Sequence, residues 1–181
     1  MVLRRSHIIL ITLLCVATLL SACNRNKSTG KVVTTDKAPV EDKEAPYIEG
    51  NKAIMRWEDE EMSLFIKRYE WDMERTGTGL YVQILAPGHG DTFQEGDEVS
   101  LKYQITMLNG EPLYDSTHDG IKTFKVARSE ELEALHEVAP MLRHGSRARL
   151  VIPSYLAYGV SGDGDRVRGR MPIAMTLEVL E

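Results

Sequence analysis

Cysteine is scarce in this chain, and so are aromatic residues. The 181 residues include two cysteines, Cys15 and Cys23, two tryptophans and three phenylalanines. Beyond position 23 the chain therefore has no thiol for a disulfide, for a cysteine-based metal site or for thiol catalysis. The remaining histidines lack the spacing of a metal-binding pair, so we expect neither a metal nor a cofactor: His89, His118, His136 and His144.

The chain also lacks an excess of positive charge. Lys and Arg number 22 against 27 Asp and Glu, which gives a formal charge of −5. Nucleic-acid binding draws its affinity from basic contacts to phosphate, so we expect no nucleic-acid partner. The length of 181 residues, 43% of them hydrophobic, fits one folded domain with extensions.

The apolar run near the N-terminus is too short for a comfortable membrane span, which needs about 20 residues. It covers residues 8–20, follows two arginines and fits the core of a signal peptide. It ends in Leu20-Ser21-Ala22-Cys23, which resembles the lipobox of bacterial lipoproteins. The resemblance implies removal of residues 1–22 and lipid attachment to Cys23. The alternative is an ordinary signal peptide that happens to contain a cysteine.

The stretch 23–50 is polar, has no apolar period and indicates a flexible tether. An amphipathic helical segment is predicted over residues 51–76, with four acidic residues, 58–61, at the helix N-terminus. Its apolar face comprises Met62, Phe65, Ile66, Tyr69 and Met73. This face either packs on its own domain or forms a dimer. Because the helix is short, we favour packing on its own domain and a monomeric protein.

From Gly79 onward the apolar period changes to two, which is typical of strands with one buried face. The clearest strand covers residues 99–107. Further alternating runs lie at 80–84, 124–126, 148–152 and 173–179. The apolar spacing over residues 132–142 predicts one helix, with Ser129 as its N-cap. The pattern predicts an α+β domain over residues 77–181, in which an antiparallel sheet wraps around one helix.

Three ordered blocks of this domain resemble FKBP-type peptidyl-prolyl cis-trans isomerases. The first covers 96–103 and continues through 109–110 to 114–116, and the second covers 142–150. The third and most specific reads Ile152-Pro153-Ser154-Tyr155-Leu156-Ala157-Tyr158-Gly159. The resemblance implies an FKBP-like fold and rotation about X-Pro bonds, a reaction that requires neither a nucleophile nor a metal.

The family's substrate pocket can be carried over position by position. The resemblance implies two aromatic walls, a carboxylate beside the ligand, two floor residues on the helix, a loop hydroxyl for a substrate carbonyl, an apolar loop residue and an apolar residue on the last strand. In that order these are Tyr103 and Tyr114, Asp115, Leu132 and Leu135, Tyr158, Val167 and Met175. Periodicity alone would make Tyr103, Leu135 and Met175 core residues, and Asp115 has a turn cap as its alternative.

This pocket is less aromatic than is usual in the family, so we expect slow catalysis. The alternative is a non-catalytic FKBP-like chaperone or assembly lipoprotein. The implied partners are proline-containing unfolded or newly exported polypeptides, and the membrane through lipidated Cys23. No acidic run follows Cys23, so we expect an anchor in the outer membrane with the domain facing the periplasm.

Mass spectrometry of the mature N-terminus should find a lipid-modified cysteine, because Cys23 stands where the hydrophobic run stops. Cys23→Ala should block processing. Cys15→Ala, which lies inside the removed segment, should leave processing unchanged. An unmodified N-terminus at any other residue would contradict the prediction.

Overall fold

The computed structural model describes residues 44–181, so the predicted signal peptide and Cys23 lie outside the described residues. The helices are α2 (Glu44–Arg68) and α3 (Glu133–Val138), with the 3₁₀ turns η1 (Ala139–Met141) and η2 (Ser154–Leu156). The strands are β1 (Glu74–Arg75), β2 (Tyr81–Ala86), β3 (Glu98–Met107), β4 (Pro112–Asp115), β5 (Lys122–Lys125), β6 (Arg147–Ile152) and β7 (Ile173–Val179). Within 44–181, no helix combines the length and apolar character that a membrane span requires.

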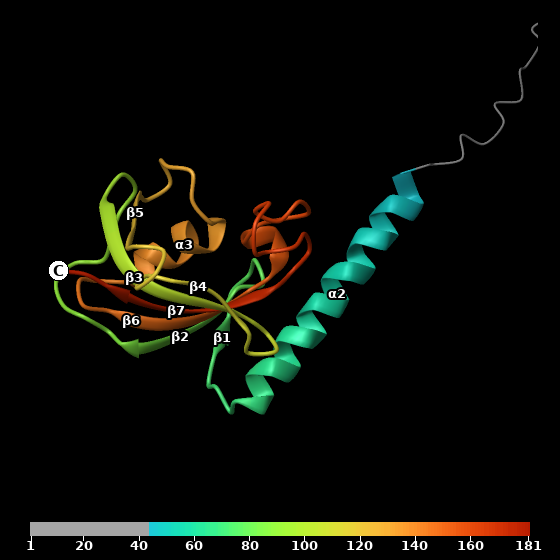
Figure 1. Cartoon of the computed structure of the whole chain (residues 1–181), viewed down its shortest axis with the longest axis horizontal. Helices are drawn as coiled ribbons and strands as arrows, with labels where there is room; N and C mark the ends of the chain where they lie inside the picture. Colours follow the sequence, from blue (N-terminus) through green and yellow to red (C-terminus); the bar gives the residue numbers. More distant parts are fainter. Residues whose placement is uncertain (1–43) are drawn as a thin grey trace, which may run out of the picture. The chain divides into compact units, whose positions relative to one another are not determined.

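The seven strands form one antiparallel sheet in the order β1-β2-β6-β7-β3-β4, with β5 also paired to β3. The longest strand, β3, pairs along one edge with β7 and along the other with β5 and then β4. Figure 1 shows α3 lying on one side of this sheet. The prediction of an antiparallel sheet wrapped around a helix is confirmed.

The main core lies between α3 and the sheet. The predicted alternation is realised in β3, where Val99, Leu101, Tyr103 and Ile105 are buried and the residues between them are more exposed. Leu135 of α3 is fully buried in the same cluster. Each large apolar side chain buried in this way stabilises the fold by about 1.5–3 kcal/mol.

The later part of helix α2 packs on the opposite face of the sheet. Met62 and Phe65 of α2 pack with Val151 of β6 and Ala174 of β7 in a second cluster. Because strand residues alternate between faces, these two strand positions point away from the α3 side. The prediction that the apolar face of this helix packs on its own domain is confirmed for Met62 and Phe65. The monomeric state stays a prediction.

The predicted bounds of this helix are wrong. It begins at Glu44, inside the stretch assigned to the tether, and the acidic residues 58–61 lie in its interior. Residues 48–57 of the helix show no apolar period because most of their side chains face solvent. Local contacts support it, including an ion pair of 2.9 Å between Lys52 and Glu49.

Helix α2 ends at Arg68, before the predicted end at residue 76. The N–H of Trp71 donates to the carbonyl of Ile66 at 3.1 Å, and the N–H of Glu70 donates to that of Lys67 at 3.2 Å. These two bonds form a Schellman motif, which places Glu70 in the left-handed region with φ of 53°.

The predicted helix over 132–142 is shorter than expected. The α-helical turns cover Glu133–Val138, and η1 continues them in tighter form with Pro140 near its start. Ser129 is not the N-cap. Its hydroxyl donates to the carbonyl of Lys125 at 3.1 Å and accepts the N–H of the same residue at 3.0 Å. Strands β1 and β4 are too short to show an alternating pattern, and the sequence does not predict them.

Strand β1 pairs only with the first two residues of β2. Among the strands of the described range, none covers the outer edge of residues 83–86. The ladder between β2 and β6 shifts register between Ile84 and Ala86, and Pro87 follows.

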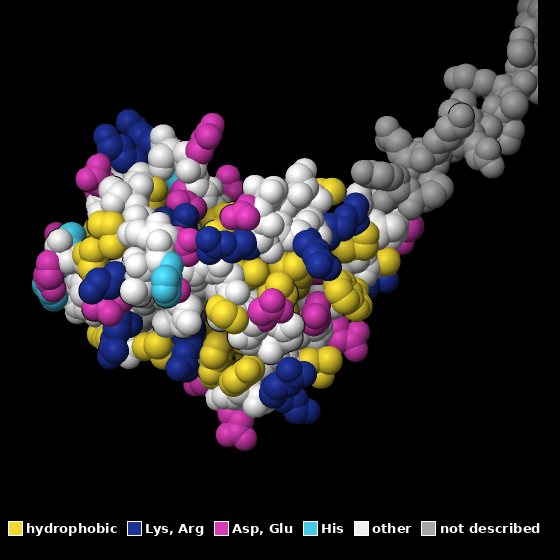
Figure 2. Space-filling model, viewed as in Figure 1, with side chains coloured by type: hydrophobic (Ala, Val, Ile, Leu, Met, Phe, Trp, Pro, Cys, Tyr) yellow, Lys and Arg dark blue, Asp and Glu magenta, His cyan; other side chains and the backbone are white. Residues whose placement is uncertain are grey.

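Hydrophobic side chains also remain at the surface, and Figure 2 shows several of them among charged groups over α2 and the neighbouring end of the sheet. On α2 and just after it, the exposed members are Ile48, Met55, Trp57, Leu64 and Tyr69.

Replacing Glu70 by glycine should raise the free energy of unfolding by about 1 kcal/mol. A left-handed conformation costs a non-glycine residue roughly 1–2 kcal/mol, and the extra freedom of glycine in the unfolded chain offsets part of the gain. Denaturant unfolding measures the change. The matched control, Glu70→Ala, removes the same carboxylate but keeps the Cβ atom, so it should give no such gain. Equal stabilisation by both variants would contradict the backbone explanation.

Candidate functional site

The residues predicted to form the pocket come from every part of the domain, and the apolar and aromatic ones meet in or against the main core. Tyr103 and Met175 lie on neighbouring strands, Leu135 on α3 and Val167 on the loop before β7. Leu132 is the N-cap of α3 and belongs to the same cluster, against which Tyr114 and Tyr158 pack half-buried. Their part in binding or catalysis stays a prediction.

The members of this group differ in what they offer to a ligand. Leu135 and Met175 are 0% and 1% exposed, and Val167 is 3% exposed, so these residues form packed support rather than open surface. The rings of Tyr114 and Tyr158 are more accessible. The candidate site is therefore an apolar surface with tyrosine walls over a closely packed floor.

Tyr158 supplies a polar group to the site. Within residues 44–181, the hydroxyl of Tyr158 forms no hydrogen bond. Burial raises the pKa of Tyr158, and the nearby carboxylate of Glu131 adds to the rise. The hydroxyl therefore stays protonated and can donate a hydrogen bond to a carbonyl oxygen of a bound peptide.

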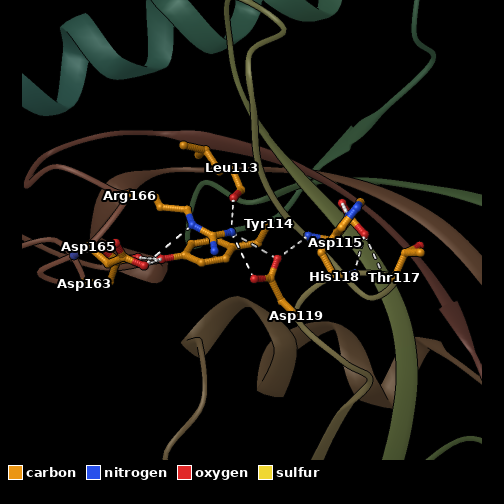
Figure 3. A network of polar contacts seen from close by, with 9 residues as sticks. All are labelled: Leu113, Tyr114, Asp115, Thr117, His118, Asp119, Asp163, Asp165 and Arg166. Atoms are coloured by element: carbon orange, nitrogen blue, oxygen red, sulfur yellow. Dashed lines mark hydrogen bonds and ion pairs between the residues drawn. The ribbon is translucent and has the colours of Figure 1, made fainter.

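Tyr114 is held in place by the loop that follows Tyr158. Its hydroxyl donates to the carboxylate of Asp163, and the guanidinium of Arg166 lies 4.5 Å from its ring centroid (Figure 3). Burial, followed by the hydrogen bond with Asp163, raises the pKa of Tyr114 to about 12. The ring is the predicted wall, but its hydroxyl is already committed and one face is covered by Arg166.

Arg166 ties this loop to β4 and to the turn that follows β4. Its guanidinium donates to the carbonyl of Leu113 at 2.8 Å and forms an ion pair of 3.0 Å with Asp119. Figure 3 shows the guanidinium at the Tyr114 ring, with Asp119 on one side and Asp163 and Asp165 on the other. The sequence analysis missed this network, although the Gly-Asp-Gly-Asp run directly before Arg166 signals a tight loop.

The tight loop depends on Asp163 and Gly162. One carboxylate oxygen of Asp163 accepts the backbone N–H groups of Asp165 and Val167, each at 2.9 Å. Gly162 has φ of +74°, and a Cβ atom there would lie 2.1 Å from the carbonyl oxygen of Val167. Only glycine allows the backbone at position 162 to lie this close to Val167. The loop therefore closes tightly, and the side chain of Val167 points into the core.

Asp115 is the charged residue among those predicted for the site. Its carboxylate accepts the backbone N–H groups of Thr117 at 2.7 Å and His118 at 3.1 Å, and it contacts Nδ1 of His118 at 2.7 Å. In Figure 3 these contacts lie on the side away from Arg166. The contacts correspond to the turn cap that was its alternative, and a role beside a bound ligand stays a prediction.

The comparisons with known proteins agree on one family. Residues 90–179 match the family model described as FKBP-type peptidyl-prolyl cis-trans isomerase. A probable FKBP-type peptidyl-prolyl cis-trans isomerase FkpA of Neisseria meningitidis serogroup B is 27% identical over 132 residues, which is 71% of this chain and 47% of that protein. The macrophage infectivity potentiator of Trypanosoma cruzi is 28% identical over 109 residues, which is 60% of this chain and 56% of that protein. The chain thus spans about half the length of these relatives.

A solved structure adds evidence on the fold. The crystal structure of FkpA from Escherichia coli superposes with a TM-score of 0.61 at 24% identity, covering 76% of this chain and 63% of that chain. The likeness confirms an FKBP-like fold, as the three sequence blocks predicted.

Replacing His118 by alanine should raise the pKa of the Asp115 carboxyl group, because the hydrogen bond from His118 is the largest cause of its lowered pKa. Since the folded-state pKa lies below the unfolded-state value, this group stabilises the fold above the unfolded-state pKa, and the contribution is lost as the pH falls through the folded-state pKa. An NMR titration of the carboxyl carbon measures the shift. His89→Ala, which removes another exposed histidine, should leave the titration unchanged. An unaltered Asp115 titration in His118→Ala would contradict the assignment.

Proposed function

Because this chain belongs to the FKBP-type peptidyl-prolyl cis-trans isomerase family through residues 90–179, we propose that it catalyses rotation about X-Pro bonds of polypeptides in the cell envelope. The meeting of the tyrosine walls, the leucine floor and the free hydroxyl of Tyr158 at one place is the observation that supports this activity most strongly.

The reaction needs an environment more than it needs a reactive group. Rotation about an X-Pro amide faces a barrier of about 18–20 kcal/mol, and the twisted transition state has lost amide resonance. Its carbonyl is less dipolar than that of the planar amide, so a dry apolar surface favours the twisted form. Tyr114 and Tyr158 would exclude water from the proline, and the hydroxyl of Tyr158 would hold a neighbouring carbonyl.

The clients and the location are part of the proposal. The clients would be unfolded or newly exported polypeptides, because rotation about an X-Pro bond is slow enough to limit folding. The location follows from the lipobox-like ending at Cys23, which would attach the protein to the outer membrane with its domain in the periplasm. Multiple acyl chains hold a protein stably, since each buried CH₂ contributes about 0.8 kcal/mol.

A second candidate is an FKBP-like chaperone without useful turnover. The floor of the site is almost fully buried, and Arg166 covers one face of Tyr114. Both features reduce the apolar surface that a proline ring can reach. In this case the domain would bind unfolded segments and slow their aggregation without accelerating rotation.

Tyr158→Phe should lower kcat/KM on X-Pro peptides by roughly 2- to 10-fold, because a lost hydrogen bond costs about 0.5–1.5 kcal/mol. Tyr114→Ala should cost more, since it opens the site to water. Tyr155→Phe is the matched control: it removes the hydroxyl of the tyrosine three residues earlier in the sequence, which donates a hydrogen bond to the carbonyl of Thr78 at 2.6 Å outside the site. It should leave kcat/KM nearly unchanged.

Unfolding midpoints of the same variants separate lost catalysis from lost folding. If the folded wild-type protein shows no rate above background across a panel of X-Pro peptides, the isomerase proposal fails. The chaperone candidate then takes its place, provided that the protein slows aggregation of an unfolded client.

A further inference from the structure

Glu58 is a buried acidic residue far from the candidate site in sequence. It lies within α2 and is 1% exposed. Its two carboxylate oxygens accept hydrogen bonds from one residue, Ser154, at the start of η2. The backbone N–H of Ser154 donates to Oε2 at 2.9 Å and the hydroxyl of Ser154 donates to Oε1 at 2.7 Å.

A carboxylate in this place is costly. Burying a charge carries a penalty of several kcal/mol unless hydrogen bonds or an opposite charge offset it. In the described part of the chain, no Lys, Arg or His side chain forms an ion pair with Glu58. Its compensation therefore comes from Ser154, which makes the position of Ser154 tightly dependent on Glu58.

Ser154 in turn organises the turn that carries Tyr158. The turn η2 has no side-chain cap of its own, so the carboxylate of Glu58 caps it from another helix. The carbonyl of Ser154 accepts the N–H of Ala157 at 3.1 Å and the N–H of Gly159 at 2.7 Å. These two bonds bracket Tyr158 on both sides. Hydrogen bonds therefore connect α2, through Ser154, to the backbone around Tyr158.

We propose that Glu58 is a positioning residue for the isomerase site: it fixes Ser154, and Ser154 fixes the turn that aims the Tyr158 hydroxyl at the bound peptide. The inference rests on the proposed function. It assigns to α2, which lies outside the matched family range, a direct part in the geometry of the site.

The competing explanation is that Glu58 only fastens α2 to the domain. Met62→Ala separates the two explanations. Met62 is 2% exposed on the same helix and packs against Val151 and Ala174 of the sheet, whereas the hydrogen bonds to Ser154 come from Glu58. If only helix packing mattered, Glu58→Ala and Met62→Ala would change kcat and hydrogen exchange by similar amounts. A positioning role predicts that they differ.

The experiment compares Glu58→Ala, Glu58→Gln, Met62→Ala and Glu60→Ala in the full chain. The amide of Glu58→Gln accepts from the N–H of Ser154 and donates to its hydroxyl oxygen, so this variant should keep the turn in place. The exposed Glu60 is the matched control on the same helix. The measurements are kcat and KM on X-Pro peptides, and hydrogen exchange of the Ala157 and Gly159 amides.

Glu58→Ala should lower kcat about tenfold with a small change in KM, because a slight misplacement of a positioned group is enough for such a loss. Exchange at Ala157 and Gly159 should accelerate in the same variant. Glu58→Gln should recover most of both properties, and Glu60→Ala should match the wild type. Equal losses in Glu58→Ala and Met62→Ala would overturn the proposal, as would wild-type kcat in Glu58→Ala.

The exchange measurement keeps the inference separate from the proposed function. If the wild-type protein has no isomerase rate, the proposed function fails, but unchanged exchange at Ala157 and Gly159 in Glu58→Ala would still overturn the positioning role. If Glu58→Ala does not fold, Ser154→Ala replaces it, since it removes only the hydroxyl. Faster exchange at both amides is then expected, and wild-type exchange would contradict the proposal.

Discussion

The register of β3 is the constraint on which the rest of the domain depends. A slip of one residue would turn its buried row, from Val99 to Ile105, toward solvent. Strand β7 fixes one edge, while β5 and β4 share the other and separate beside Tyr103. At this separation the carbonyl of Tyr103 accepts the N–H of Ser116 at 2.9 Å, so the turn after β4 starts there. The candidate site forms where a strand changes its partner, which explains why its residues come from so many elements.

The sequence predicts the sheet well because burial on one face leaves a period of two in each long strand. It predicts α2 poorly because solvent imposes no such period on the exposed first part of that helix. The acidic residues 58–61 show the limit of a local rule. Four acids in a row suggest a helix N-terminus, yet they lie inside α2, and Glu58 among them is buried against Ser154.

The candidate site also contains residues that the sequence predicts and contacts that it does not predict. The family's motifs and spacing predict Tyr103 and Met175 as site residues, because both lie on strands whose register is fixed by the core. The contacts of Arg166 join residues about fifty positions apart, and no local pattern contains such information. Asp115 shows a further limit, since a short acidic side chain after a strand suits a turn as well as a ligand. Whether such a side chain caps a turn depends on where the backbone N–H groups of the following residues lie. The fold, and not the local sequence, determines those positions.

The bulged edge of β2 has a consequence for a protein that would handle unfolded chains. An open, regular edge strand offers a row of hydrogen-bonding groups to any extended polypeptide, and such pairing leads to aggregation. Here the register shift near Ala86 twists the edge, and Pro87 has no N–H group to continue a ladder. The stretch left uncovered by β1 is therefore only a few residues long. An unfolded polypeptide could form few backbone hydrogen bonds with this edge of β2. We therefore expect bound polypeptides to dissociate from it rather than to aggregate with it.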